Sequence, residues 1–190
     1  MPKLWNETIE AHRRDVQAAV IDATAALIAE NGLLSVTMSR IAEDSGIGRA
    51  TLYKYFPDVE SILVAWHERQ MSAHLQYLTA VKDNAGNPAD RLSAVLEAYA
   101  LMVHQAAKHH GNALAALVHR PDRTAEPELQ LRQMVQGLIA EAISSGAVRS
   151  DVPPDELAIY CVNALGAAGQ LPSNAAVRRL AAVTVSGLRQ

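Results

Sequence analysis

The chain has 190 residues, 49% of them hydrophobic and 19% charged, and its formal net charge is -3. This balance is typical of a globular protein and excludes a disordered or generally basic chain, so any affinity for nucleic acid must be confined to one patch. The only cysteine, Cys161, cannot form a disulfide within the chain, and no apolar signal core or membrane-length run is present. We expect a cytoplasmic protein without a membrane span.

The first half of the chain predicts four helices. They are expected over residues 15–31, from Thr37 to Asp44 or Ser45, over 49–55 and over 59–82. Gly32 and Gly46 end the first two, because glycine readily takes left-handed backbone angles. Thr37 and Asp58 are suited to cap the second and fourth helices, and Pro57 ends the third.

The second half predicts further helices separated by polar turns. An apolar stripe from Leu92 to Ala106 follows a loop at 83–88, and a second stripe runs from Leu131 to Ile143. Gly111-Asn112 is expected to interrupt the first of these helices, leaving a short helix over 113–119 and a loop over 120–127. A helix through Cys161 and a last helix ending near Leu188 complete the series. The sequence therefore predicts an all-α fold of about nine helices.

Two short helices joined at Gly46 form a helix-turn-helix pattern. Ile41, Ala42, Ile47 and Leu52 are expected to pack inward. The residues left facing outward are Arg49, Ala50, Tyr53 and Lys54. Arginine can reach guanine edges in the major groove, while tyrosine and lysine can reach phosphates. The spacing alone is equally consistent with a solvated surface on an ordinary helical pair.

Residues 15–63 resemble the N-terminal domain of the TetR family of transcriptional regulators. The most specific part is the run TLYKYF following IAEDSGIG. The matching residues are Ala19, Ala23, Leu27, Gly32, Thr37, Ile41, Ala42, Gly46, Ile47, Thr51, Leu52, Tyr53, Tyr55, Phe56, Glu60 and Leu63.

The resemblance implies a homodimeric regulator, a repressor, that binds a palindromic operator in double-stranded DNA and is released by a small molecule. It implies a three-helix DNA-binding domain over 1–57, a ligand-binding and dimerisation domain over 58–190, and no cofactor. The residues it assigns to DNA binding are Thr37, Arg40, Gly48, Arg49, Ala50, Thr51, Tyr53, Lys54 and Tyr55.

The sequence departs from the family pattern at two positions. Val59 stands where the family commonly has a lysine, and Gly48 stands where it often has a serine. One phosphate contact and one hydroxyl contact are therefore in doubt. The basic residues Lys3, Arg13 and Arg14 either supply compensating contacts or form an ordinary solvated terminus.

Large adaptable side chains on inward stripes of residues 58–190 are candidates to line an effector pocket. They are Trp66, Tyr77, Tyr99, Met102, Met134 and Tyr160. Each is also explained by ordinary core packing. The apolar balance favours an apolar or aromatic effector of unknown identity.

Small residues are abundant in the last two predicted helices, around 164–169 and 175–182. Small side chains let helices approach closely, so two such helices from each chain could form a four-helix dimer interface. Packing within one chain is the alternative. A two-fold dimer would also place two recognition helices about one DNA turn, ~34 Å, apart.

Other chemistry finds little support in the sequence. The seven histidines lack the i, i+4 pairing of a helical metal site, so we expect no bound metal. No nucleophile elbow, phosphate loop or paired-cysteine motif is present in the sequence, so we expect that the protein is not an enzyme. Cys161 is best explained as a buried small hydrophobe. The alternative function is a helical small-molecule-binding protein or enzyme on the same fold, without specific DNA binding.

Overall fold

The computed structural model describes the backbone of residues 2–118 and 125–189 and the side chains of 9–108 and 128–189. These residues contain eight α-helices, two 3-10 turns and no strand, which confirms the all-α class with one helix fewer than predicted. The chain divides into two compact units, unit 1 (Met1–Gln70 with Ala113–Val118) and unit 2 (Met71–Asn112 with His119–Gln190). The predicted functional division between residues 57 and 58 stays a prediction.

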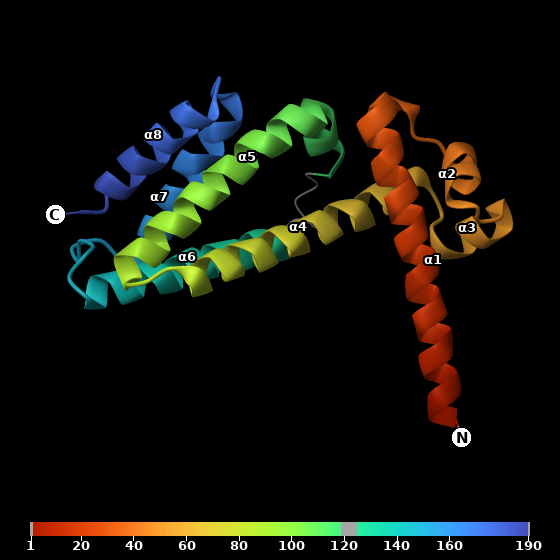
Figure 1. Cartoon of the computed structure of the whole chain (residues 1–190), viewed down its shortest axis with the longest axis horizontal. Helices are drawn as coiled ribbons and strands as arrows, with labels where there is room; N and C mark the ends of the chain where they lie inside the picture. The colour runs from red at the N-terminus through yellow and green to blue at the C-terminus, as the bar shows by residue number, and fades with distance from the viewer. Residues whose placement is uncertain (1, 119–124, 190) are drawn as a thin grey trace. The chain divides into compact units, whose positions relative to one another are not determined.

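The elements follow one another along the chain as short and long helices (Figure 1). In order they are α1 (Pro2–Asn31), η1 (Leu33–Ser35), α2 (Met38–Ser45), α3 (Arg49–Tyr55), α4 (Val59–Asn84), α5 (Pro88–Val118), α6 (Ala125–Ser144), α7 (Pro154–Gly166), η2 (Ala167–Gln170) and α8 (Asn174–Ser186).

Unit 1 is built around apolar side chains from α1, α2, α3 and the start of α4. Its buried residues are Val20, Ile21, Leu27, Ile28, Val36, Ile41, Ala42, Leu52, Phe56, Ile62, Leu63 and Trp66. An exposed ion pair of 2.7 Å between Asp22 and Arg69 joins α1 to α4 over this core. Helix α1 begins at Pro2 and not near residue 15, because the polar residues preceding the apolar stripe have good helix propensity and continue the helix.

The predicted caps define the short helices of unit 1. The Thr37 hydroxyl accepts a hydrogen bond from the backbone N–H of Arg40 at 3.3 Å, which caps α2. Gly46 ends α2 with a φ of 68°, in the left-handed region. A carboxylate oxygen of Asp58 accepts from the N–H of Ser61 at 2.7 Å at the start of α4. The predicted caps at Thr37, Gly46 and Asp58 are confirmed.

Unit 2 has its own core, formed where α4, α5, α6, α7 and α8 meet. Its largest fully buried residues are Leu78, Leu92, Leu96, His104, Leu138, Ile139, Leu165 and Leu188. Helix α5 runs unbroken to Val118, so the predicted interruption at Gly111-Asn112 is wrong. A single glycine costs a helix only about 1 kcal/mol, which neighbouring turns can offset. Of the predicted loop over 120–127, residues 120–124 lie outside the described part; α6 begins at Ala125.

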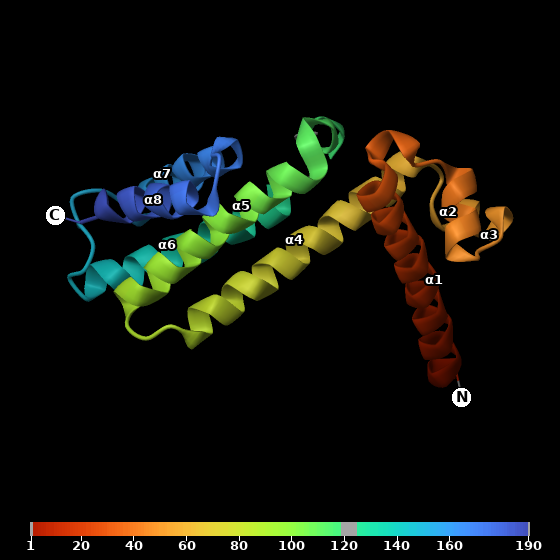
Figure 2. The same cartoon turned by 45° about the horizontal axis from the view of Figure 1, so that its top comes forward.

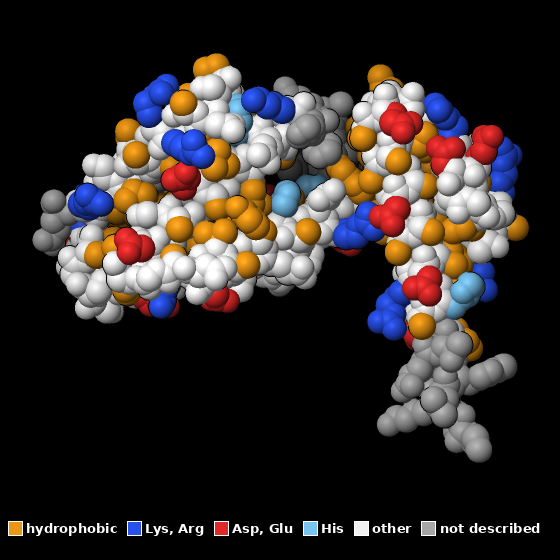
Figure 3. Space-filling view, viewed as in Figure 1, with side chains coloured by type: hydrophobic (Ala, Val, Ile, Leu, Met, Phe, Trp, Pro, Cys, Tyr) orange, Lys and Arg blue, Asp and Glu red, His pale blue; other side chains and the backbone are white. Residues whose placement is uncertain are grey.

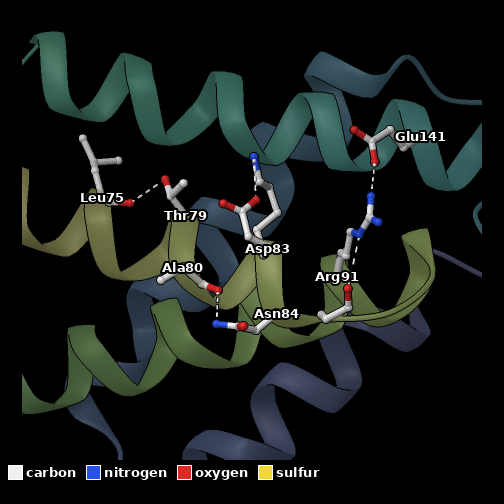
Figure 4. Close-up of polar contacts among 9 residues, drawn as sticks. Leu75, Thr79, Ala80, Asp83, Asn84, Arg91 and Glu141 are labelled. Atoms are coloured by element: carbon white, nitrogen blue, oxygen red, sulfur yellow. Dashed lines mark hydrogen bonds and ion pairs between the residues drawn. The ribbon is translucent and has the colours of Figure 1, made fainter.

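Polar contacts fix the short connection between α4 and α5 (Figure 4). Asn84 donates to the carbonyl oxygen of Ala80 at 2.9 Å near the end of α4. Arg91 donates from Nε to the carbonyl oxygen of Ala85 at 3.4 Å and lies 3.5 Å from the Glu141 carboxylate on α6. One arginine thus links the connection, α5 and α6.

Helices α7 and α8 lie side by side in unit 2 (Figures 1 and 2). Helix α7 begins with Pro154, which fits the first turn because its missing N–H would have no helical partner there. The Ser173 hydroxyl accepts from the N–H of Ala176 at 3.3 Å and caps α8. Between the helices, η2 packs on α5, where His104 Nδ1 lies 3.1 Å from the carbonyl oxygen of Ala168. Across the described residues, no helix is both long and apolar enough to cross a bilayer.

Two glycine substitutions are expected to change stability in opposite directions. Gly46→Ala places a side chain at a φ of 68°, so we expect a loss of about 1–2 kcal/mol in the free energy of unfolding. Gly137 is an exposed residue inside α6 with open space around its Cα, so Gly137→Ala should stabilise by about 0.5–1 kcal/mol. Denaturant unfolding of both variants checks this; a stabilised Gly46→Ala would contradict the assigned turn.

Candidate nucleic-acid interface

Helix α3 separates its side chains into a buried and an exposed set. Leu52 is fully buried and Phe56, which follows the helix, is 5% exposed. The N–H of Phe56 donates to the carbonyl oxygen of Leu52 at 2.9 Å. The exposed residues of α3 are Arg49, Ala50, Thr51, Tyr53 and Lys54, and Tyr55 is half-buried. This split places the candidate base-reading and phosphate-binding groups on one accessible surface.

The start of α2 lies in the same helix-turn-helix. Thr37 and Arg40 are both exposed there, and the Thr37 hydroxyl serves as the cap. Backbone N–H groups in the first turn of a helix carry a partial positive charge that favours a phosphate. The sequence placed both residues correctly in this first turn; their contact with DNA stays a prediction.

A side-chain bridge between α2 and α3 was not anticipated from the sequence. Nη2 of Arg49 donates a hydrogen bond to the Ser39 hydroxyl. Ser39 lies on the exposed side of α2, ten residues before Arg49. The bridge holds the guanidinium at the junction of the two helices, so it restricts the directions in which Arg49 can point.

The two departures from the family pattern have plain structural descriptions. Gly48 precedes α3 with extended backbone angles and provides no side-chain cap. Val59 is partly buried and packs against the core of unit 1. Position 59 thus contributes apolar packing where a lysine would contribute charge.

The N-terminal basic residues lie within helix α1. Arg13 and Arg14 are both exposed on α1, and Arg14 Nε donates to the carbonyl oxygen of Glu10 at 3.3 Å. The side chain of Lys3 lies outside the described residues. The alternatives of DNA contact and solvated surface both stay open for the two arginines.

The six predicted pocket residues do not form one set. Trp66 is buried in the core of unit 1, while Tyr99, Met102 and Met134 pack, partly buried, against the core of unit 2. Tyr77 and Tyr160 are 54% and 44% exposed, so the expectation that they face inward is wrong for these two. Tyrosine is compatible with a helix surface because its ring is amphipathic. Ligand contact by any of the six stays a prediction.

Two ionisable side chains of unit 2, Cys161 and Tyr99, have raised pKa values, which favour their neutral forms. Burial raises the pKa of the Cys161 thiol to about 12. Burial, and then the nearby Glu128 carboxylate, raise the pKa of Tyr99. No group of three or more potential metal ligands is found among the described residues. The side chains of His109 and His110 fall outside that part.

The thiol of Cys161 should be unreactive in the folded protein. With a pKa of about 12, only about one in ten thousand molecules carries the thiolate at pH 8, and the side chain is fully buried. We expect a disulfide reagent such as DTNB to label the native protein at least about a hundred times more slowly than the urea-unfolded protein. Equal rates would show that the thiol is accessible.

Comparisons with known proteins agree with this geometry. Residues 20–65 match the family described as bacterial regulatory proteins, tetR family, and residues 87–190 match the C-terminal domain of SbtR-like transcriptional regulators. The chain is 22% identical over 144 residues to a fatty acid metabolism regulator protein of Bacillus subtilis, covering 72% of this chain and 73% of that protein. It is 30% identical over 96 residues to the transcriptional regulator BetI of Rhizobium meliloti, covering 50% of this chain and 44% of BetI.

Solved structures share the fold. A TetR/AcrR-family regulator from Thermobifida fusca has a TM-score of 0.76 at 20% identity, covering 93% of this chain and all of that one. FadR from Bacillus subtilis, solved with stearoyl-CoA, has a TM-score of 0.63 at 18% identity over 90% of this chain and 96% of FadR. RolR, solved with resorcinol, has a TM-score of 0.64 at 20% identity over 94% of this chain and 90% of RolR. With family models matching most of its length and a helix-turn-helix in place, the chain belongs to the tetR family of bacterial regulatory proteins and is a DNA-binding transcriptional regulator.

Proposed function

We propose that the protein is a repressor that binds a palindromic operator as a homodimer and is released by a small apolar or aromatic effector. The observation that carries the DNA-binding part is the division of α3, with Leu52 buried and Arg49, Tyr53 and Lys54 exposed. In this proposal α3 enters the major groove. Arg49 and Ala50 face base edges, and Tyr53 and Lys54 approach phosphates on either side. Because its DNA target is cytoplasmic, the repressor acts in the cytoplasm.

The proposed phosphate contacts extend to the start of α2. Thr37 and Arg40 flank its first turn, where the helix dipole favours an anion. The predicted contact set also includes three residues around α3. Gly48 precedes the helix, Tyr55 is its last residue, and Thr51 lies on its exposed side. Contacts of this kind set register on the duplex without reading its sequence.

Exposed apolar side chains on α7 and α8 support the proposed dimer. Ile159 and Tyr160 are each 44% exposed and Val183 is 66% exposed. Small exposed residues follow at the end of α7 and just after it, at Gly166 and Ala167. A face of this composition is favoured at a helix–helix interface, because small side chains permit close approach around larger ones. Two copies related by a two-fold axis would then present two recognition helices to successive turns of DNA.

The proposed effector class rests on the composition of unit 2 and on its relatives. Three of the predicted pocket residues are partly buried beside the apolar core, namely Tyr99, Met102 and Met134. In this proposal they contact the ligand when the surrounding helices move apart. FadR and RolR, which share the fold, were solved with an acyl-CoA and an aromatic diol. A ligand that binds the DNA-free conformation better would lower operator affinity by linkage.

Selection of bound sequences from a random duplex library at physiological salt tests the proposal. We expect a two-fold symmetric motif for the wild-type protein. Arg49→Ala should weaken binding to that motif by about 1–3 kcal/mol and blur base preference at one position in each half-site. If the same variant lost equal affinity for random DNA, Arg49 would contact a phosphate and not a base.

The Ser39 bridge predicts a smaller effect of the same kind. Ser39→Ala removes the hydroxyl that holds Arg49, so more side-chain entropy is lost on binding, and we expect specific affinity to fall by about 0.5–1.5 kcal/mol. Fluorescence anisotropy on the selected operator and on a scrambled duplex separates the change in specific affinity from any change in non-specific affinity. Tighter specific binding by Ser39→Ala would show that the bridge must break before Arg49 can read a base.

Adjacent substitutions on α8 test the dimer face. Val183→Glu places a charge among exposed apolar residues and should convert the dimer to a monomer at micromolar concentration. Ala182→Glu, one residue earlier and about 100° around the helix, should leave the dimer intact. Sedimentation velocity measures both. Dissociation by Ala182→Glu with an intact Val183→Glu dimer would place the interface on another side of α8.

A further inference from the structure

An open groove in unit 2 lies between α5 and α8. Its volume is about 340 Å³. The apolar part of its lining comes from Ala181, Ala182 and Val185, which follow one another at helical spacing on α8. Ligand clefts generally measure about 300–1,000 Å³, so a groove of this size suits a small molecule and excludes a large one.

The remaining lining is polar and carries an excess of positive charge. It consists of Ser93 and Glu97 on α5, Arg178 and Ser186 on α8, and Arg189 just beyond α8. Arg178 Nε donates to the Glu97 carboxylate at 3.0 Å, which leaves its two terminal nitrogens outside that bond. Within the described part of the chain, no ion pair involves Arg189. The negative charge of Glu97 therefore offsets the positive charge of only one of the two arginines in the groove.

The charge excess continues along α8. Residues 174–190 contain three arginines and no aspartate or glutamate. Figure 3 shows basic side chains over α8, with an acidic side chain beside one of them. Because the side chains of Arg178 and Glu97 are 62% and 46% exposed, their charges are screened by water and the pair itself contributes little stability. The uncompensated arginine charge is available to a ligand.

We propose that this groove binds a small organic anion with a short hydrocarbon tail, such as a medium-chain carboxylate. The carboxylate would accept hydrogen bonds from Arg189, the terminal nitrogens of Arg178 and the Ser186 hydroxyl. The tail would cover Ala181, Ala182 and Val185. Charge-assisted bonds from arginine are among the stronger ones in proteins, and the apolar lining adds burial of the tail. This site goes beyond the proposed function, whose effector is placed beside the core.

The groove lies on a different side of α8 from the proposed dimer face. At 100° per residue, Val183 is about 140° around the helix from Arg178 and about 160° from Ala181. Arg178, Ala182 and Val185, which line the groove, fall within about 60° of one another by the same reckoning. A ligand in the groove therefore bridges α5 and α8 of one chain and does not need a partner chain.

Calorimetric titration of the full-length protein with octanoate tests this proposal, with 1-octanol as the uncharged match. We expect octanoate to bind with one site per chain and octanol to bind at least about 5-fold more weakly, because octanol lacks the charge that the arginines recognise. Arg189→Gln should weaken octanoate by a similar factor, and Ala182→Glu should abolish binding by placing a carboxylate in the groove. Arg179→Gln is the matched control, since Arg179 is exposed on α8 but does not line the groove.

Three results would overturn the proposal. The first is no octanoate binding to the folded wild-type protein. The second is equal affinity for octanoate in wild-type and Arg189→Gln, which would place the anion elsewhere, including in the effector site. The third is equal weakening by Arg179→Gln, which would reduce the effect to general surface charge. Circular dichroism of each variant confirms folding, and operator binding, measured separately, distinguishes failure of this site from failure of the repressor.

Discussion

Burial of Leu52 and Phe56 is the constraint on which the DNA-facing surface depends. Leu52 has no exposed surface and Phe56 only 5%, and both belong to the core that α1 and α2 share with α3. Burying each side chain contributes about 1.5–3 kcal/mol. Since α3 has only seven residues, it would not be stable alone in water. Packing therefore fixes both the existence of α3 and the side it presents to solvent.

The caps convert this packing into a definite orientation. Thr37 begins α2, Gly46 ends it, and Asp58 begins α4 only three residues after α3 ends. Each cap fixes a helix end by satisfying backbone groups or by taking an angle that other residues resist. Arg49 then starts α3 at the junction with α2, where the Ser39 hydroxyl can reach it. A regulator needs this precision because base edges are read over distances of a single hydrogen bond.

Local signals in the sequence predicted the helix-turn-helix of unit 1 well, although not the start of α1. The bounds of α3 and the three caps follow from glycine, proline and side-chain oxygens whose effects act within a few residues. The Arg49–Ser39 bridge could not be predicted, because it depends on how two helices face each other. The same limit applies to the groove between Glu97 and Arg178, which are 81 residues apart.

Unit 2 shows where local reasoning fails. Gly111-Asn112 looks like a break, yet α5 passes through it. Helical spacing placed Leu92, Val95 and Leu96 inside correctly, but it also placed Tyr77 and Tyr160 on inward stripes although each is about half exposed. Aromatic residues with a polar tip are compatible with either side of a helix. Periodicity identifies the core and does not identify a ligand site within it.

The central claim is that the exposed side of α3, with the start of α2, is the surface that binds the operator. Amide chemical shifts of the full-length protein, measured by NMR with and without the selected operator duplex, test it most directly. We expect the largest changes within residues 37–55, including Arg49, Tyr53 and Lys54. Scrambled DNA of equal length should shift the Arg49 and Ala50 signals far less. Changes concentrated instead on residues 174–189, where three arginines lie, with residues 37–55 unmoved, would contradict this proposal.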